Sequence, residues 1–290
     1  MVVCHMDWTL VVFGGAARAE GHKVALWAHG FQTGWHWLER MARCNRPDLA
    51  IANSRFTAGV VRSRFPNTPV SVIYCPVEPP ADFDNASQWR AATREEQGAD
   101  ESTTVILQAG RLEAWKGHLI QLQALSQLKT ERKWVFWIAG GPQTAEQEHY
   151  FRGLRETAQR LGIADRVRFL GQRTDVPMLM AAADIFCQPN QEPEPFGLVF
   201  VEALWAGLPV ITSDIGGAVE VVDESCGLLV KPGDAGCLAQ AMDALIESAS
   251  LRGRLGGAGV ERARALCDPA SQMNKLHELL RPAMLPRFSR

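Results

Sequence analysis

Two glutamates frame the start of a helix predicted over residues 197–206. Glu194 lies just before this helix and Glu202 lies inside it, about 7–8 Å further along the axis at about 1.5 Å per residue. The first backbone N–H groups of a helix have no partner within it, so its N-terminus attracts anions. Carboxylates beside such a site suit a ligand that carries hydroxyls next to phosphates, as a nucleotide sugar does. We therefore interpret Glu202 as an acceptor for the ribose diol and Glu194 as a group facing the sugar. For an isolated pair of glutamates, a loop charge and a solvated helix residue are the simpler interpretation.

Two cations, Arg111 and Lys116, lie in the loop of residues 110–117, which follows a predicted strand. In doubly wound sheets, ligands bind beyond the carboxyl ends of the strands. Further polar loops follow later strands at Gly140-Gly141, Gly171-Gln172-Arg173 and Gly216-Gly217. Two cations and backbone N–H groups can neutralise a leaving diphosphate without a metal. For Arg111 alone a surface salt bridge is the default, but Lys116 in the same loop favours phosphate binding.

Cysteine usage and charge narrow the function classes. The seven cysteines are scattered and form no CxxC or Cys/His cluster, which argues against a zinc site and a disulfide framework. We expect no metal and no cofactor. The net charge of −2 gives no whole-chain case for nucleic acid binding. Residues 1–77 hold eight Lys/Arg and four Asp/Glu, so this part could meet an acidic acceptor or a membrane surface, although an ordinary solvated face is simpler.

Strands alternating with helices position these loops. Apolar runs predict strands over residues 104–109, 134–139, 167–171, 183–187 and 209–212. An earlier series predicts strands at residues 1–5, 22–30, 49–53 and 70–74, with helices over 8–18, 35–43 and 55–64. Such alternation is typical of parallel sheets. The chain of 290 residues suggests about two domains. We predict a partial Rossmann-like domain at residues 1–80, a linker at 81–103 with one short helix, and a donor-binding domain at 104–265. A C-terminal tail at 266–290 is expected to pack back on the first domain.

Several motifs together resemble the donor domain of family 4 (group 1) retaining glycosyltransferases of the GT-B fold. The motifs are Gly110-Arg111-Leu112, Lys116-Gly117, Phe169-Leu170-Gly171, Glu194-Pro195-Phe196-Gly197-Leu198, Glu202-Ala203-Leu204, Gly207-Leu208-Pro209-Val210 and Gly216-Gly217. Seven residues separate the two glutamates, as in the E-x7-E signature of that family. The resemblance covers about residues 104–250 and is specific in combination.

The resemblance implies metal-independent transfer from a nucleoside-diphosphate sugar, such as a UDP- or GDP-sugar, with retained configuration. Arg111 and Lys116 would stabilise the donor diphosphate, beside Gly110. Glu202 would hold the ribose, Arg173 would lie near the base, and Glu194 with the backbone of Phe196, Gly197 and Leu198 would hold the sugar. Glu192 is also acidic, but the spacing to Glu202 selects Glu194.

The first part of the chain is similar to the second half of the family's acceptor domain. The strand ending in His29-Gly30 implies that His29 lies near the transferred sugar. His5 is a weaker candidate for the same role. The glycine-rich loop that normally opens this domain has no good counterpart here, so we expect an incomplete, shortened N-terminal domain in an otherwise GT-B-like α/β fold.

The sequence predicts a hexosyltransferase acting on an unidentified acceptor hydroxyl of a glycan, a lipid or a small molecule. One alternative is a nucleotide-sugar-binding remnant, or one part of a two-chain transferase. A nucleotide-sugar epimerase fits the glutamate spacing less well. The scattered cysteines favour a reducing compartment, so we expect a cytoplasmic protein. No segment approaches the length of a membrane span. Peripheral contact with the inner membrane face, or self-association through the incomplete domain, stays open.

Overall fold

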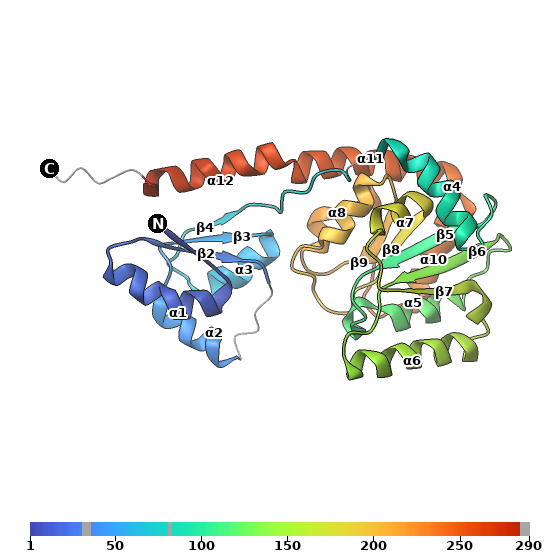
Figure 1. The fold of residues 1–290 in the computed structure, drawn as a ribbon, viewed down its shortest axis with the longest axis horizontal. Helices are drawn as coiled ribbons and strands as arrows, with labels where there is room; N and C mark the ends of the chain where they lie inside the picture. Colours follow the sequence, from blue (N-terminus) through green and yellow to red (C-terminus); the bar gives the residue numbers. More distant parts are fainter. Residues whose placement is uncertain (31–35, 81–82, 285–290) are drawn as a thin grey trace. The chain divides into compact units, whose positions relative to one another are not determined.

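Two parallel β-sheets organise the chain in a computed structural model that describes residues 1–30, 36–80 and 83–284 (Figure 1). Unit 1 comprises Met1–Glu78, the short segment Glu194–Phe196 and the segment that begins at Leu266. Unit 2 comprises Pro79–Pro193 and Gly197–Ala265. The predicted α/β class with two parallel sheets is confirmed.

Unit 1 contains a four-stranded sheet in the order β1-β2-β3-β4, and every neighbouring pair is parallel. Its strands are β1 (Val2–His5), β2 (Val24–Ala28), β3 (Leu49–Ala52) and β4 (Val70–Val72). Its helices are α1 (Met6–Ala19), α2 (Trp37–Ala42), the 3-10 turn Arg43–Asn45, α3 (Arg55–Arg64) and α12 (Pro269–Met284). The helix that we predicted from Trp35 starts at Trp37 among the described residues, and Trp35 itself lies outside them.

Local sequence signals explain these helices. Ser54 caps α3, because its hydroxyl accepts a hydrogen bond from the backbone N–H of Thr57 at 2.9 Å.

A buried ion pair joins α1 to α3, with 2.7 Å between a guanidinium nitrogen of Arg64 and a carboxylate oxygen of Asp7. Burial raises the pKa of Asp7 above its usual range, and the neighbouring Arg64 opposes that rise.

Unit 2 contains a six-stranded parallel sheet in the order β10-β9-β8-β5-β6-β7. Its strands are β5 (Thr104–Ala109), β6 (Trp134–Ala139), β7 (Val167–Gly171), β8 (Ile185–Gln188), β9 (Val210–Ser213) and β10 (Gly227–Val230). Its α-helices are α4 (Ala86–Glu96), α5 (His118–Leu125), α6 (Ala145–Arg160), α7 (Val176–Ala182), α8 (Leu198–Trp205), α9 (Ala218–Val221), α10 (Ala235–Glu247) and α11 (Ala249–Cys267). Short 3-10 turns occur at Phe83–Asn85, Ala114–Lys116 and Ala164–Arg166. Strands β5, β6, β8 and β9 are buried along their whole length, as expected of a sheet covered on both faces, whereas the edge strands β7 and β10 are only partly buried.

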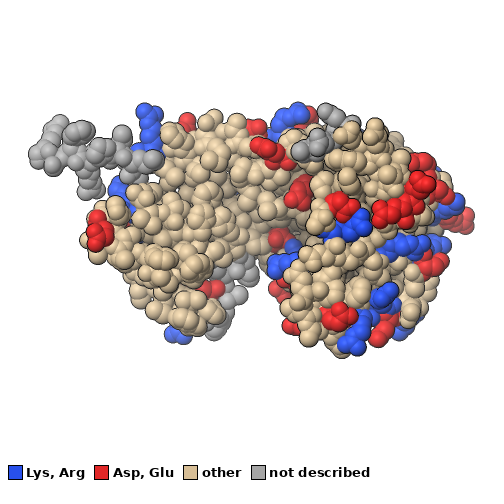
Figure 2. Space-filling view, in the orientation of Figure 1, with Lys and Arg blue, Asp and Glu red and all other residues tan. Residues whose placement is uncertain are grey.

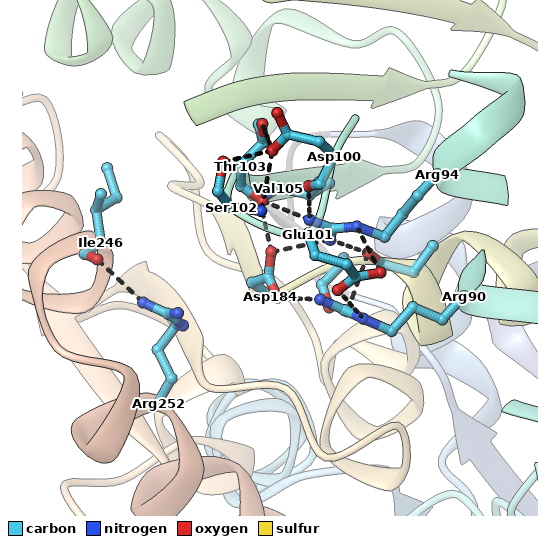
Figure 3. A network of polar contacts seen from close by, with 12 residues as sticks. Arg90, Arg94, Asp100, Glu101, Ser102, Thr103, Val105, Asp184, Ile246 and Arg252 are labelled. Atoms are coloured by element: carbon cyan, nitrogen blue, oxygen red, sulfur yellow. Dashed lines mark hydrogen bonds and ion pairs between the residues drawn. The ribbon is translucent and has the colours of Figure 1, made fainter. Parts of the chain in front are cut away.

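Residues 81–103, predicted as a linker with a short helix, contribute α4 to unit 2. Figure 3 shows the polar network that holds this helix against the sheet. Arg94, only 2% exposed, donates to the carbonyl of Ala182 at 2.9 Å and to the Asp184 carboxylate at 3.2 Å. Asp184 also accepts from Arg90 at 2.8 Å and from the backbone N–H of Val105 at 2.7 Å. The network therefore ties α4 to the starts of two central strands.

Within the described residues, no helix is long and apolar enough to cross a membrane.

Candidate functional site

The carboxyl ends of β5, β6, β8 and β9 lie together at one edge of the unit 2 sheet, because these strands are parallel neighbours in the order β9-β8-β5-β6. The loops that the sequence singled out leave the sheet at this edge. They begin at Gly110, Gly140, Pro189 and Asp214. This is the edge at which open α/β sheets bind ligands.

Close backbone approaches at this edge require glycine. Gly117 has a φ of 80°, and a Cβ there would lie 2.0 Å from the carbonyl oxygen of Pro189. A Cβ on Gly140 would lie 2.1 Å from the carbonyl oxygen of Gly110. Because no side chain fits such gaps, the two glycines let neighbouring loops pack against each other. They thereby fix the path of the loop that carries Arg111 and Lys116.

The two predicted phosphate-binding cations have local partners. A guanidinium nitrogen of Arg111 lies 2.9 Å from a carboxylate oxygen of Glu113, while the Arg111 side chain stays 66% exposed. The Lys116 ammonium lies 4.0 Å from the ring centroid of Trp115. The indole N–H of Trp115 in turn donates to Glu113 at 2.8 Å. Glu113 and Trp115, which the sequence interpretation missed, thus hold the cationic loop in shape.

Helix α8 begins at Leu198, directly after Gly197, whose φ of 93° suits glycine. Glu202 lies on this helix and is half-buried. Burial raises the pKa of the Glu202 carboxyl above its usual range. A partly desolvated carboxylate of this kind accepts hydrogen bonds from ligand hydroxyls more strongly than a solvated one does.

Arg173 follows β7 and forms a two-point ion pair with Asp175, with distances of 2.7 and 2.5 Å. It also lies 3.5 Å from Glu96. The structure therefore orients the Arg173 guanidinium through unit 2 carboxylates.

Glu194 and Phe196 belong to unit 1, although the residues on either side of their segment belong to unit 2. The ring of Phe196 stacks on Tyr74 with 5.7 Å between centroids. The hydroxyl of Thr57 donates to the carbonyl of Pro195 at 3.4 Å. These unit 1 contacts hold the segment that carries Glu194.

His29 lies just beyond the end of β2 in unit 1, beside His5 at the end of β1. Nδ1 of His5 lies 2.8 Å from Nε2 of His29, and the two rings stack at 5.0 Å. Burial lowers the pKa of His29, and the neighbouring His5 lowers it further. Met6, directly after His5, has a φ of 67° and is the only described non-glycine residue with a positive φ. Such backbone strain is often found at functional sites. It supports His5 as a candidate site residue beside His29, although the sequence interpretation ranked His5 lower.

Buried polar side chains end the central strands of unit 2. Gln108 ends its apolar run one residue before the end of β5 and donates to the carbonyl of Lys116 at 2.8 Å. Gln188 ends β8 and donates to the side-chain oxygen of Asn190 at 3.0 Å. The sequence interpretation missed both residues, although each is a polar residue that closes an apolar strand. They support the loops from beneath.

No group of three or more His, Cys, Asp or Glu side chains in the described part of the chain could hold a metal ion. The sequence does contain one Asp-x-Asp triplet, Asp82-Phe83-Asp84, and Asp82 lies outside the described residues. The absence of a metal therefore stays a prediction.

Residues 90–262, more than half of the chain, match the family described as "Glycosyl transferases group 1". The chain belongs to this family. The resemblance to this family that the sequence motifs indicated is thereby confirmed.

Similar proteins include a D-inositol 3-phosphate glycosyltransferase of Streptomyces scabiei, which is 32% identical over 232 residues, or 75% of this chain and 50% of that protein. A phosphatidyl-myo-inositol mannosyltransferase of Mycobacterium leprae is 40% identical over 122 residues, or 40% of this chain and 33% of that protein. The crystal structure of HepE from Anabaena in complex with UDP-glucose matches with a TM-score of 0.83 and 28% identity, covering 97% of this chain and 78% of that one. The chain spans about half the length of the curated relatives it matches.

Proposed function

We propose that this group 1 glycosyltransferase chain binds a nucleoside-diphosphate sugar and transfers the sugar to an acceptor hydroxyl, with retention of configuration and without a metal. The observation that carries the proposal is the edge of the unit 2 sheet at which the strands β5, β6, β8 and β9 end, which we call the donor edge. There, two cations and the start of α8 follow parallel strands, and Glu202 lies on that helix. The similarity to HepE, which was solved with UDP-glucose, supports a uridine nucleotide as the first donor to test.

The proposed division of labour follows from the chemistry of each group. Arg111, Lys116 and the backbone N–H groups at the start of α8 stabilise the charge that develops on the departing diphosphate. Glu202 accepts hydrogen bonds from the ribose diol. Glu194 and the backbone from Phe196 to Leu198 hold the sugar.

Two further groups complete the proposed site. Arg173, held by Asp175 at 2.7 Å, serves the base side. His29 serves the transferred sugar, and its lowered pKa favours a neutral imidazole that can donate or accept a hydrogen bond.

Relatives named for inositol phosphate and phosphatidylinositol acceptors make an inositol hydroxyl the first acceptor to test. We expect Lys116→Ala, Glu194→Ala and Glu202→Ala each to lower turnover about 100-fold or more, as loss of a transition-state contact typically does. Glu156→Ala, an exposed glutamate of α6, is the matched control.

The product's anomeric configuration, read by NMR, tests retention, and turnover in the presence of EDTA tests metal independence. If the three variants turn over as well as the parent, the site assignment is wrong. Donor binding without transfer or donor hydrolysis across an acceptor panel favours the non-catalytic alternative instead.

A further inference from the structure

One carboxylate connects the two cations of the donor edge. Oε1 of Glu113 lies 2.9 Å from a guanidinium nitrogen of Arg111, and Oε2 accepts a hydrogen bond from the indole N–H of Trp115 at 2.8 Å. The ring of Trp115 in turn lies under the Lys116 ammonium, with 4.0 Å between the nitrogen and the ring centroid. Glu113 therefore contacts Arg111 directly and reaches Lys116 through Trp115.

A single ion pair on this surface would carry little meaning. Figure 2 shows charged groups of both signs interspersed over the visible face of unit 2, and exposed pairs contribute little to stability. Glu113 differs because both of its oxygens have partners and its side chain is only 23% exposed. Its backbone is fixed as well, since its N–H donates to the carbonyl of Arg111 and its carbonyl accepts from the N–H of Lys116, both at 2.9 Å. A carboxylate held on so many sides can hold its partners in turn.

Two opposite effects of Glu113 on a bound diphosphate follow from these contacts. Arg111 has a long side chain that is 66% exposed, so ordering it on binding costs rotamer entropy. The contact with Glu113 restricts the guanidinium before a ligand arrives and thereby lowers this cost. The negative charge of Glu113, however, repels a diphosphate, and Arg111 compensates for that charge only while it is present. Removing Arg111 therefore separates the two effects.

We propose that Glu113 is a positioning residue of the donor-diphosphate site. It holds the Arg111 guanidinium and, through Trp115, the Lys116 ammonium in place for the diphosphate. This inference rests on the proposed function and adds to it the residue that orders its two cations. The effect of Glu113 passes through Arg111 and Trp115, because its own charge has the wrong sign to bind a phosphate.

The Kd of UDP, measured by calorimetry in two backgrounds, tests the contact with Arg111. In the parent, Glu113→Gln should weaken UDP binding about threefold, because the guanidinium loses its charged partner. In the Arg111→Met background the sign should reverse. There Glu113→Gln should tighten binding about threefold relative to Arg111→Met alone, because it removes a carboxylate that now only repels the diphosphate.

The reversal of sign distinguishes positioning from two simpler roles. A carboxylate that merely keeps the loop folded predicts weaker UDP binding for Glu113→Gln in both backgrounds. A carboxylate that merely repels the diphosphate predicts tighter binding in both. Either result overturns the proposal.

The route through Trp115 has its own test. Trp115→Phe keeps a ring for the Lys116 ammonium but removes the N–H that Glu113 accepts. It should weaken UDP binding about threefold in the parent and cause no further loss in Glu113→Ala, where that N–H has no carboxylate to bind. An equal loss in both backgrounds would overturn this route.

Matched controls separate this proposal from the proposed function. Glu247→Gln changes a second carboxylate of unit 2 that pairs with an arginine, Arg132 at 2.8 Å, and should bind UDP like the parent. Circular dichroism checks that each variant is folded. If Lys116→Ala loses UDP binding while the Glu113 variants bind like Glu247→Gln, only the positioning role fails. If the parent binds no UDP, or if Lys116→Ala binds it as well as the parent, the donor site itself is wrong and the positioning role fails with it.

Discussion

At the scale of single residues, the His5–His29 pair makes a prediction about proton binding. Nε2 of His29 lies 2.8 Å from Nδ1 of His5, so a positive charge on His29 is disfavoured by its neighbour. Burial disfavours the protonated form of His29 further. We expect His5→Gln to move the pKa of His29 back toward its usual 6.5, because it removes one of the two causes of the lowering. The His29 ring protons, followed by NMR across pH, measure the shift.

The sign of the pH effect on stability follows from the same pair. A folded-state pKa below the unfolded value means that the unfolded chain binds the proton more readily. The folded protein therefore loses stability as the pH falls below about 6.5 toward the lowered pKa of His29. In His5→Gln this acid-side loss should be smaller. An unchanged His29 titration in His5→Gln would show that burial alone lowers the pKa.

At the scale of elements, the Arg94–Asp184 network predicts where a single substitution most lowers the stability of unit 2. Replacing Arg94 by Met removes a guanidinium that is 2% exposed and leaves the carbonyl of Ala182 and part of Asp184 without this donor. Breaking a buried ion pair on one side costs about 3–5 kcal/mol. We expect Arg94→Met to lower the free energy of unfolding by about that amount, measured by urea titration.

The exposed pair of Arg132 and Glu247, at 2.8 Å, provides the comparison. Arg132→Met should cost far less than Arg94→Met, because solvent screens the exposed pair. Equal losses in the two variants would mean that α4 is not anchored by Arg94.

Many elements could be predicted from the sequence, because short local patterns mark where they begin and end. Helix α3 and strands β5, β6 and β7 have the predicted bounds, because an apolar run or a Ser54 cap marks their ends. The fold class followed from the alternation of such runs. The strand predicted over residues 22–30 was too long, since β2 spans Val24–Ala28. Contacts made by folding could not be predicted, such as Glu113 with Trp115 at 2.8 Å, or His5 with His29. Spacing along a chain does not show which side chains meet across strands.

At the scale of the whole molecule, donor binding should appear as added stability, because a ligand that binds only the folded state raises its free energy of unfolding. At about 100 times its Kd, UDP should add about 2.7 kcal/mol, which corresponds to a rise of several degrees in Tm. We expect this rise in the parent and in the control Lys129→Ala, and its loss in Lys116→Ala and Glu202→Ala. His29→Ala should keep most of the rise in Tm, because in our proposal His29 serves the sugar and UDP carries none.

EDTA should leave the rise unchanged if the diphosphate is held by Arg111, Lys116 and the start of α8 alone. Loss of the rise in EDTA would instead assign part of the diphosphate binding to a metal. A full rise in Lys116→Ala and Glu202→Ala would place the nucleotide away from the donor edge of unit 2.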